Sequence, residues 1–133
     1  MIKGVALDAG GGRLATSSSD ETVGLWDLAT RRKLGSYGKS SLGYASVSFS
    51  RAGKRIAAAT GEGGPVKVWD IASGHEVARF KYTERVVKVR FAADDRTLVI
   101  STASELSLFR APTFAEINAA ETGASKSHQL PVR

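Results

Sequence analysis

The chain has 133 residues, of which 42% are hydrophobic and 24% charged, as in one folded domain rather than a disordered chain. No apolar run approaches the roughly 18 residues of a membrane-spanning helix, and the first residues lack the apolar stretch of a signal peptide. We therefore expect a cytoplasmic protein with no membrane partner. The absence of cysteine excludes disulfides, thiolate nucleophiles and zinc sites built on cysteine. The net charge of +6 favours acidic partners without identifying one.

A repeat of about 42 residues organises the chain. The segment 23–28, Val-Gly-Leu-Trp-Asp-Leu, recurs at 66–71 as Val-Lys-Val-Trp-Asp-Ile and, in altered form, at 106–110 as Leu-Ser-Leu-Phe-Arg. Trp26, Trp69 and Phe109 are thus 43 and 40 residues apart. An alternating strand pattern precedes each segment in the same phase and starts every 42 residues, at Val5, Val47 and Val89.

In chain order, each unit contains four short strands separated by polar turns. The second strand of each unit is a stretch of small and β-branched residues that suits a buried strand, predicted at 13–18, 55–60 and 97–102. The Trp-Asp segments form the third strands. Fourth strands are predicted at 33–37, 76–80 and 113–120. This order predicts an all-β chain made of three four-stranded antiparallel units.

A period of 40 to 45 residues with four strands and a Trp-Asp dipeptide closing the third resembles the WD-repeat family. The resemblance runs from Ile2 to about Ala120 and implies a partial β-propeller, incomplete as a single chain. Its blades are expected at about 2–37, 44–80 and 86–120, with 121–133 as a disordered C-terminal tail. The pattern at 108–117 is also similar to the C-terminal repeats of bacterial WD-repeat proteins, some of which are fused to serine/threonine kinases.

The resemblance implies structural roles for the repeated aromatic and acidic residues. Trp26 and Trp69 are expected to pack between adjacent sheets, with Phe109 at the equivalent position of the third unit. Asp27 and Asp70 are expected to accept hydrogen bonds from the backbone of the turn that follows.

The chain departs from the family's pattern in one respect. Family members often carry a hydrogen-bonded tetrad of His, Asp, Ser or Thr, and Trp, but here only Asp20 matches the tetrad aspartate. His75 follows the second Trp-Asp pair, in a predicted exposed turn rather than at the tetrad position. We therefore expect the blades to depend more on their neighbours for stability.

Catalytic and metal-binding patterns are not supported. Gly10-Gly11-Gly12 lacks the Gly-Lys-Ser/Thr of a phosphate-binding loop and fits a hairpin turn. His75 has no nucleophile elbow near it, and His128 offers no second ligand at metal-site spacing. The basic clusters lack interleaved aromatic residues and are interpreted as a solvated face rather than a nucleic-acid site. The sequence thus predicts a protein without catalysis, metal or cofactor.

Protein partners of this family usually bind at loops on one end of the propeller. These are the loops that join successive blades and those that join the second strand to the third. By alignment they fall at 18–22, 37–44, 60–65, 81–85 and 102–105. Tyr44 and Arg85 are the candidate partner-binding residues, because Tyr and Arg are enriched among binding hot spots and both fall just before a first strand. The alternative is that Tyr44 only caps its own blade.

Three blades are fewer than the four to eight of a closed propeller. We expect a protein-interaction scaffold that is a fragment, or the C-terminal part, of a larger WD-repeat protein. One alternative is a regulatory segment of a multidomain signalling enzyme such as a bacterial serine/threonine kinase. Another is a half-propeller that closes as a homo-oligomer of two chains.

Overall fold

The computed structural model describes residues 1–110 and 128–132, which form strands and turns; it describes no helix with the length and apolar character needed to span a membrane. The strands make three four-stranded antiparallel sheets. The first sheet contains β1 (Ile2–Leu7), β2 (Arg13–Ser18), β3 (Val23–Asp27) and β4 (Arg32–Tyr37). The second contains β5 (Tyr44–Phe49), β6 (Arg55–Thr60), β7 (Val66–Asp70) and β8 (Glu76–Phe80). The third contains β9 (Val86–Phe91), β10 (Thr97–Thr102), β11 (Leu106–Arg110) and β12 (His128–Val132).

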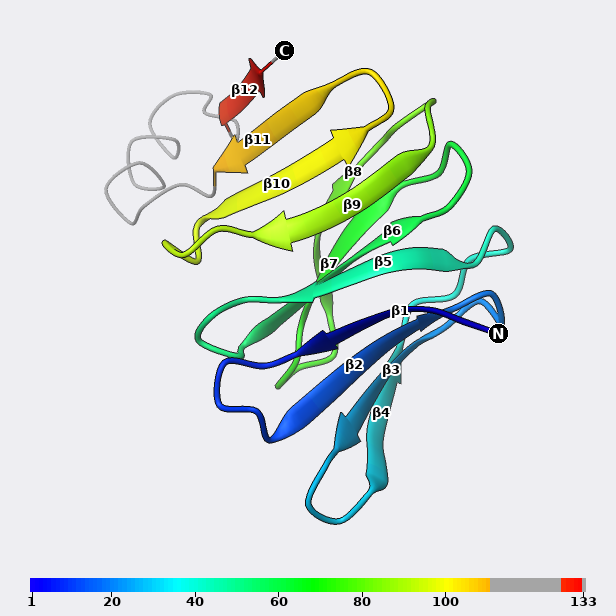
Figure 1. Cartoon of the computed structure of the whole chain (residues 1–133), viewed down its shortest axis with the longest axis vertical. Coiled ribbons are helices and arrows are strands. Elements are labelled where there is room, and N and C mark those ends of the chain that lie inside the picture. The colour runs from blue at the N-terminus through cyan, green and yellow to red at the C-terminus, as the bar shows by residue number, and fades with distance from the viewer. Residues whose placement is uncertain (111–127, 133) are drawn as a thin grey trace.

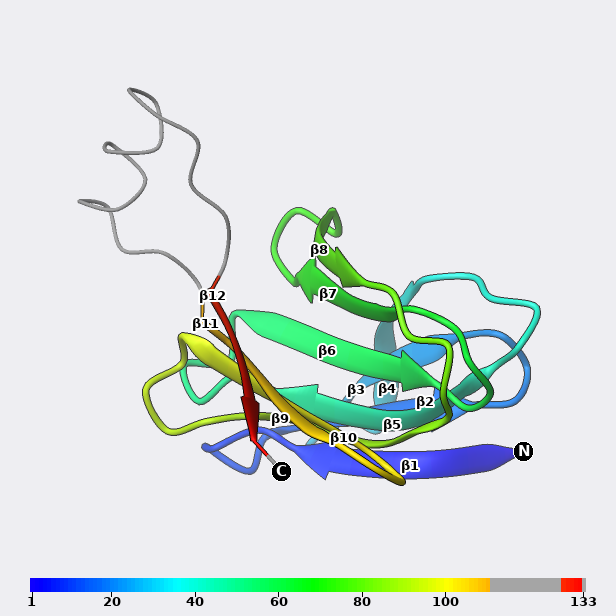
Figure 2. The same cartoon turned by 90° about the horizontal axis from the view of Figure 1, so that it is seen from above.

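The three sheets pack side by side as an open arc. Each sheet follows chain order from its first strand to its fourth, and the first strands β1, β5 and β9 are neighbours along the inner side (Figure 1). Seen from above, the middle sheet runs in order from β8 through β7 and β6 to β5 (Figure 2). The architecture is that of a partial, unclosed β-propeller, as the repeat predicts, and the second strands lie at the predicted residues.

The middle sheet is covered on both faces, and its second strand shows this most clearly. β6 has the sequence Arg-Ile-Ala-Ala-Ala-Thr, and all of its residues after Arg55 are buried. A strand that is buried on both faces loses the polar/apolar alternation of a half-exposed strand. The three alanines have small side chains, which let the flanking sheets approach closely.

Trp69 lies at the centre of the interface between the first and second sheets. Its side chain is 3% exposed, and its ring centroid lies 6.2 Å from that of Tyr37 and 5.8 Å from that of Tyr44. Gly38, with a φ of +66°, packs against the same rings, and a Cβ at this position would lie 2.6 Å from Cζ2 of Trp69. Glycine is therefore required here by both its backbone angle and the space available.

The interface between the second and third sheets is aliphatic at its centre and aromatic at its rim. Phe80 and Phe109 pack at a centroid distance of 4.2 Å. Phe109 thus contacts the preceding sheet, as Trp69 does one repeat earlier. The buried members of this cluster are Ala57, Ala59, Val66, Val68, Val86, Val89, Leu98 and Ile100.

The outer strand of the third sheet differs from the sequence expectation. The predicted strand 113–120 lies outside the described residues, and β12 pairs with β11 instead, from Leu106 opposite Val132 to Arg110 opposite His128. The segment 121–133, which the sequence predicts as a disordered tail, thus includes the described strand β12. The free edge of β11 offers unpaired backbone groups that a strand can satisfy, and Pro131, which lacks an N–H, is tolerated because β12 is an edge strand.

Turns on the end of the arc away from the N-terminus link neighbouring sheets through side chains. Arg13 donates from Nε to Asp8 over 2.9 Å and from its Nη2 to the Gly53 carbonyl of the next sheet over 2.7 Å. In the third sheet, the carboxylate of Asp95 accepts hydrogen bonds from the backbone N–H groups of Arg51 and Ala52. Each sheet is thus attached to the next at this end.

Aspartates in the turns accept hydrogen bonds from backbone N–H groups and from side chains. The Asp27 carboxylate accepts from the N–H of Ala29, and that of Asp70 accepts from the N–H and hydroxyl of Ser73. The Ser73 hydrogen bonds hold the pKa of Asp70 below 3.8. The hydrogen bond from Arg13 likewise lowers the pKa of Asp8.

Trp69→Ala should lower the free energy of unfolding by about 3–5 kcal/mol, because it leaves a cavity between two sheets. Trp26→Ala should cost clearly less, because Trp26 is only partly buried. Urea unfolding of the two variants measures the difference. Equal losses would show that the two indoles are equally buried in solution.

The free energy of unfolding should fall as the pH drops below about 4. A carboxyl whose pKa is lower in the folded state stabilises the protein above its unfolded pKa, and this contribution is lost as the pH falls through the folded value. Asp70→Asn removes one such carboxyl and should make the acid dependence shallower. Urea unfolding across this pH range tests it; an unchanged slope would contradict the role of Asp70.

Candidate protein-binding surfaces

The predicted structural residues lie in blade interfaces and turns rather than in a common site. Trp69 and Phe109 face the preceding sheets, whereas Trp26 lies on the outward face of the first sheet, where its Nε1 donates to the Thr16 hydroxyl over 3.1 Å. Asp20 accepts from the N–H and hydroxyl of Thr22, and the Thr22 hydroxyl lowers the pKa of Asp20. Asp20 therefore forms a local turn instead of a tetrad with Trp26.

His75 does not belong to a catalytic or metal-binding cluster. It lies exposed in the turn after β7, where its N–H donates to the hydroxyl of Ser73 over 3.3 Å. Among the residues that the structure describes, there is no group of three or more His, Cys, Asp or Glu side chains that could hold a metal ion.

The predicted binding loops gather at one end of the arc, here called the loop end: 18–22, 37–44, 60–65, 81–85 and 102–105. In Figure 1 this end lies on the same side as the N-terminus. The loops of the first two sheets touch. The N–H of Ser40 donates to the carbonyl of Glu21 over 3.3 Å, and a Cβ on Gly43 would lie 2.9 Å from Cα of Ser19.

The loops of the second and third sheets touch in the same way. A Cβ on Gly63 would lie 2.8 Å from the carbonyl oxygen of Thr83. The hydroxyl of Ser104 lies 2.9 Å and 2.7 Å from the two carboxylate oxygens of Glu84. Contacts of this kind run from sheet to sheet across the whole loop end.

The two predicted partner-binding residues differ in accessibility. Arg85 is exposed at the loop end. Tyr44 is 1% exposed, and burial raises the pKa of its hydroxyl to about 12. Its ring packs edge-on against Trp69. This position corresponds to the alternative interpretation, in which Tyr44 caps its own blade.

Leu42 is a loop-end residue that the sequence reasoning missed. Its side chain is 50% exposed, two residues before the buried Tyr44. A leucine among Ser40, Ser41 and Gly43 was the available signal, because an apolar residue in a polar turn is exposed unless something covers it.

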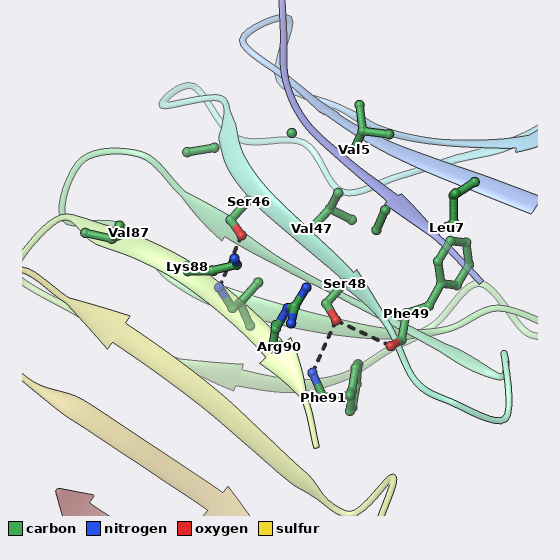
Figure 3. Close-up of a pocket in the computed structure, with 14 residues that line it drawn as sticks. Val5, Leu7, Ser46, Val47, Ser48, Phe49, Val87, Lys88, Arg90 and Phe91 are labelled. Atoms are coloured by element: carbon green, nitrogen blue, oxygen red, sulfur yellow. Dashed lines mark hydrogen bonds between the residues drawn. The ribbon is translucent and has the colours of Figure 1, made fainter. Parts of the chain in front are cut away.

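A cavity of about 630 Å³ runs along the inner strands β1, β5 and β9 (Figure 3). Lys88 and Arg90 of β9 line it, together with Ser46 and Ser48 of β5. The serine hydroxyls accept hydrogen bonds from the N–H groups of Val89 and Phe91, over 3.1 and 3.2 Å. We call this cavity the inner groove. The sequence predicts a solvated face for the basic clusters and does not predict this groove.

Within the described part of the chain, each of the two end sheets has an outward face that no other sheet covers. Val5 and Leu7 of the first sheet are 61% and 60% exposed, although their repeat equivalents Val47 and Phe49 are buried in the first interface. On the third sheet, Val99, Leu106 and Leu108 are partly exposed. Their repeat equivalents in the second sheet, Ala57, Val66 and Val68, are buried in the second interface.

No protein-family model matches the chain. The chain is similar to the guanine nucleotide-binding protein subunit beta-5b of Danio rerio, with 36% identity over 87 residues. The match covers 63% of this chain and 22% of that protein, so the chain spans about a fifth of the length of this curated relative. Because the relative is eukaryotic, the resemblance to bacterial proteins stays a prediction.

Two solved structures share the fold. The β-propeller domain of Cps50 (Swd1) from Myceliophteria thermophila has a TM-score of 0.79 at 19% identity, covering 99% of this chain and 37% of that one. Hydrazine synthase from Kuenenia stuttgartiensis has a TM-score of 0.73 at 15% identity, covering 82% and 32%. At these identities, the likeness shows the fold alone. With its repeated Trp-Asp dipeptides, its four-stranded blades and its similarity to part of the beta-5b subunit, the chain resembles the WD-repeat β-propeller proteins.

Proposed function

We propose that the chain is a non-catalytic scaffold that binds a protein partner at its loop end. The observation that carries this proposal is the set of contacts between loops of successive sheets, such as Ser40 with Glu21 and Ser104 with Glu84. Loops that already support one another lose less conformational freedom on binding, so more of the contact energy contributes to affinity.

The loop end offers both charged and apolar contacts. Exposed Arg85 supplies a guanidinium, and Leu42 supplies an apolar side chain beside it on the same end of the arc. Tyr44 supports this surface from below through its packing on Trp69 and Gly38. In this proposal Tyr44 supports the loop end by its packing and does not itself contact the partner.

The proposal also covers the cellular compartment and the larger protein to which the chain belongs. The chain would work in the cytoplasm, as part of a larger WD-repeat protein whose other segments supply further blades. A fused signalling enzyme, such as a bacterial serine/threonine kinase, is the alternative context. The chain covers 37% of the solved β-propeller domain that it matches, and this share supports the expectation of further blades.

Arg85→Glu and Leu42→Asp should each reduce capture of protein partners from a lysate of the source cells by at least about tenfold, because hot-spot residues carry most of the binding energy. Arg32→Glu makes the same charge change on β4, away from the loop end, and serves as the matched control. Quantitative mass spectrometry of the captured proteins measures the effect. Retention of every partner by both loop-end variants would rule out this surface.

A second candidate function is self-association, in which two chains cover each other's outward faces. The repeat equivalence favours it, because the outward face of the first sheet matches the face that the second sheet presents to the first. The outward face of the third sheet likewise matches the face that the second presents to the third. Two such arcs would total six blades, within the range of closed propellers.

Light scattering of the purified 133-residue chain should then give the mass of two chains. Val5→Asp with Leu7→Asp should convert it to a monomer, because each places a carboxylate in an apolar interface. Val77→Asp, at an exposed valine of the outer strand β8, is the matched control and should leave the dimer intact. A folded monomer in the unmodified chain would exclude this function.

A further inference from the structure

The inner groove has an uncompensated positive charge. The strands β1, β5 and β9 contain Lys3, Lys88 and Arg90 but no aspartate or glutamate. Lys88 and Arg90 are exposed and line the cavity, and neither forms an ion pair within the described part of the chain. Figure 3 shows both side chains extending from β9 at the cavity. A carboxylate that enters the groove would therefore meet two cations and no competing anion.

The spacing of the two cations selects the shape of the ligand. Lys88 and Arg90 are two residues apart on one strand, so they project to the same side, roughly 7 Å apart along it. Carboxylates at alternate positions of an extended peptide have the same separation. Carboxylates three residues apart on an extended peptide point to opposite faces, so they would not match both cations at once.

The strand that carries the cations is held in place before any ligand binds. The hydroxyls of Ser46 and Ser48 accept the N–H groups of Val89 and Phe91, the residues that follow Lys88 and Arg90. These bonds attach β9 to β5 across the interface between two sheets. The cavity of about 630 Å³ lies within the range of known ligand sites.

The geometry points to the inner groove as a binding site for an extended acidic peptide segment of a partner, with carboxylates at alternate positions that pair with Lys88 and Arg90. This site is separate from the loop end, so it does not depend on the proposed function there. A partner could occupy either site or both.

The test uses a fluorescently labelled peptide with glutamate at every second position and a second peptide of the same composition whose glutamates are three residues apart. Fluorescence anisotropy measures the binding of both to the full chain. The alternating peptide should bind more tightly. Lys88→Gln with Arg90→Gln should weaken its binding by about tenfold, because two charge pairs are lost.

Arg51→Gln with Lys54→Gln is the matched control. It removes the same charge from exposed residues of the turn between β5 and β6, so it separates local pairing from long-range attraction. Circular dichroism checks that both double variants fold. Equal weakening by both pairs, equal affinity for the two peptides, or tighter binding of single-stranded nucleic acid would overturn the proposal.

The loop end provides an internal reference. The groove variant should retain the partners that Arg85→Glu loses, if those partners bind only at the loop end. Loss of peptide binding in Lys88→Gln with Arg90→Gln, with loop-end capture intact, supports a second site. Retention of every captured partner by Arg85→Glu and Leu42→Asp would refute the proposed function and leave the peptide result to stand by itself.

Discussion

A four-stranded sheet with apolar residues on both faces needs another sheet on each side, and this constraint determines the rest of the structure. The middle sheet satisfies it, which is why β6 is buried from Ile56 to Thr60. The first and third sheets satisfy it on one face only. Val5 and Leu7 are therefore exposed at positions whose repeat equivalents are buried. The same chemistry that holds neighbouring sheets together leaves two faces of the arc able to accept further sheets.

The fold could be predicted because each strand pattern occurs three times in the sequence, once in each repeat. The Trp-Asp segments define the phase, and the second strands follow from it at the residues where the structure has them. The outer strand of the third sheet could not be predicted in this way. β12 pairs with β11 because the edge of β11 offers unpaired backbone groups. The polar composition and Pro131 of the C-terminal segment do not indicate this pairing.

The candidate site could likewise be predicted only in part from the sequence. The loops were predicted from the repeat, but the burial of Tyr44 depends on Trp69 and Gly38, which other strands and turns bring to it. Residue type alone favoured Tyr44 as a binding residue, whereas its surroundings make it part of the core. Leu42 is exposed instead, although leucine is less typical of binding hot spots.

The inner strands carry two alternating sets of side chains with different chemistry. In each unit, one set of side chains faces the preceding sheet or its place and is apolar in all three repeats: Val5, Val47 and Val89, followed by Leu7, Phe49 and Phe91. The alternate set is small in the first unit, hydroxylic in the second and basic in the third: Gly4 and Ala6, Ser46 and Ser48, Lys88 and Arg90. A preceding sheet, where present, covers the first set, whereas the second set faces the following sheet or its place. In the first unit this set packs, because Ala6 contacts the core of the first interface and a Cβ on Gly4 would lie 3.0 Å from the carbonyl oxygen of Ala45. In the second unit the hydroxyls attach one strand to the next, and in the third unit the exposed cations give the groove its charge. The same alternate positions therefore serve packing in one blade, attachment in the next and charge in the third.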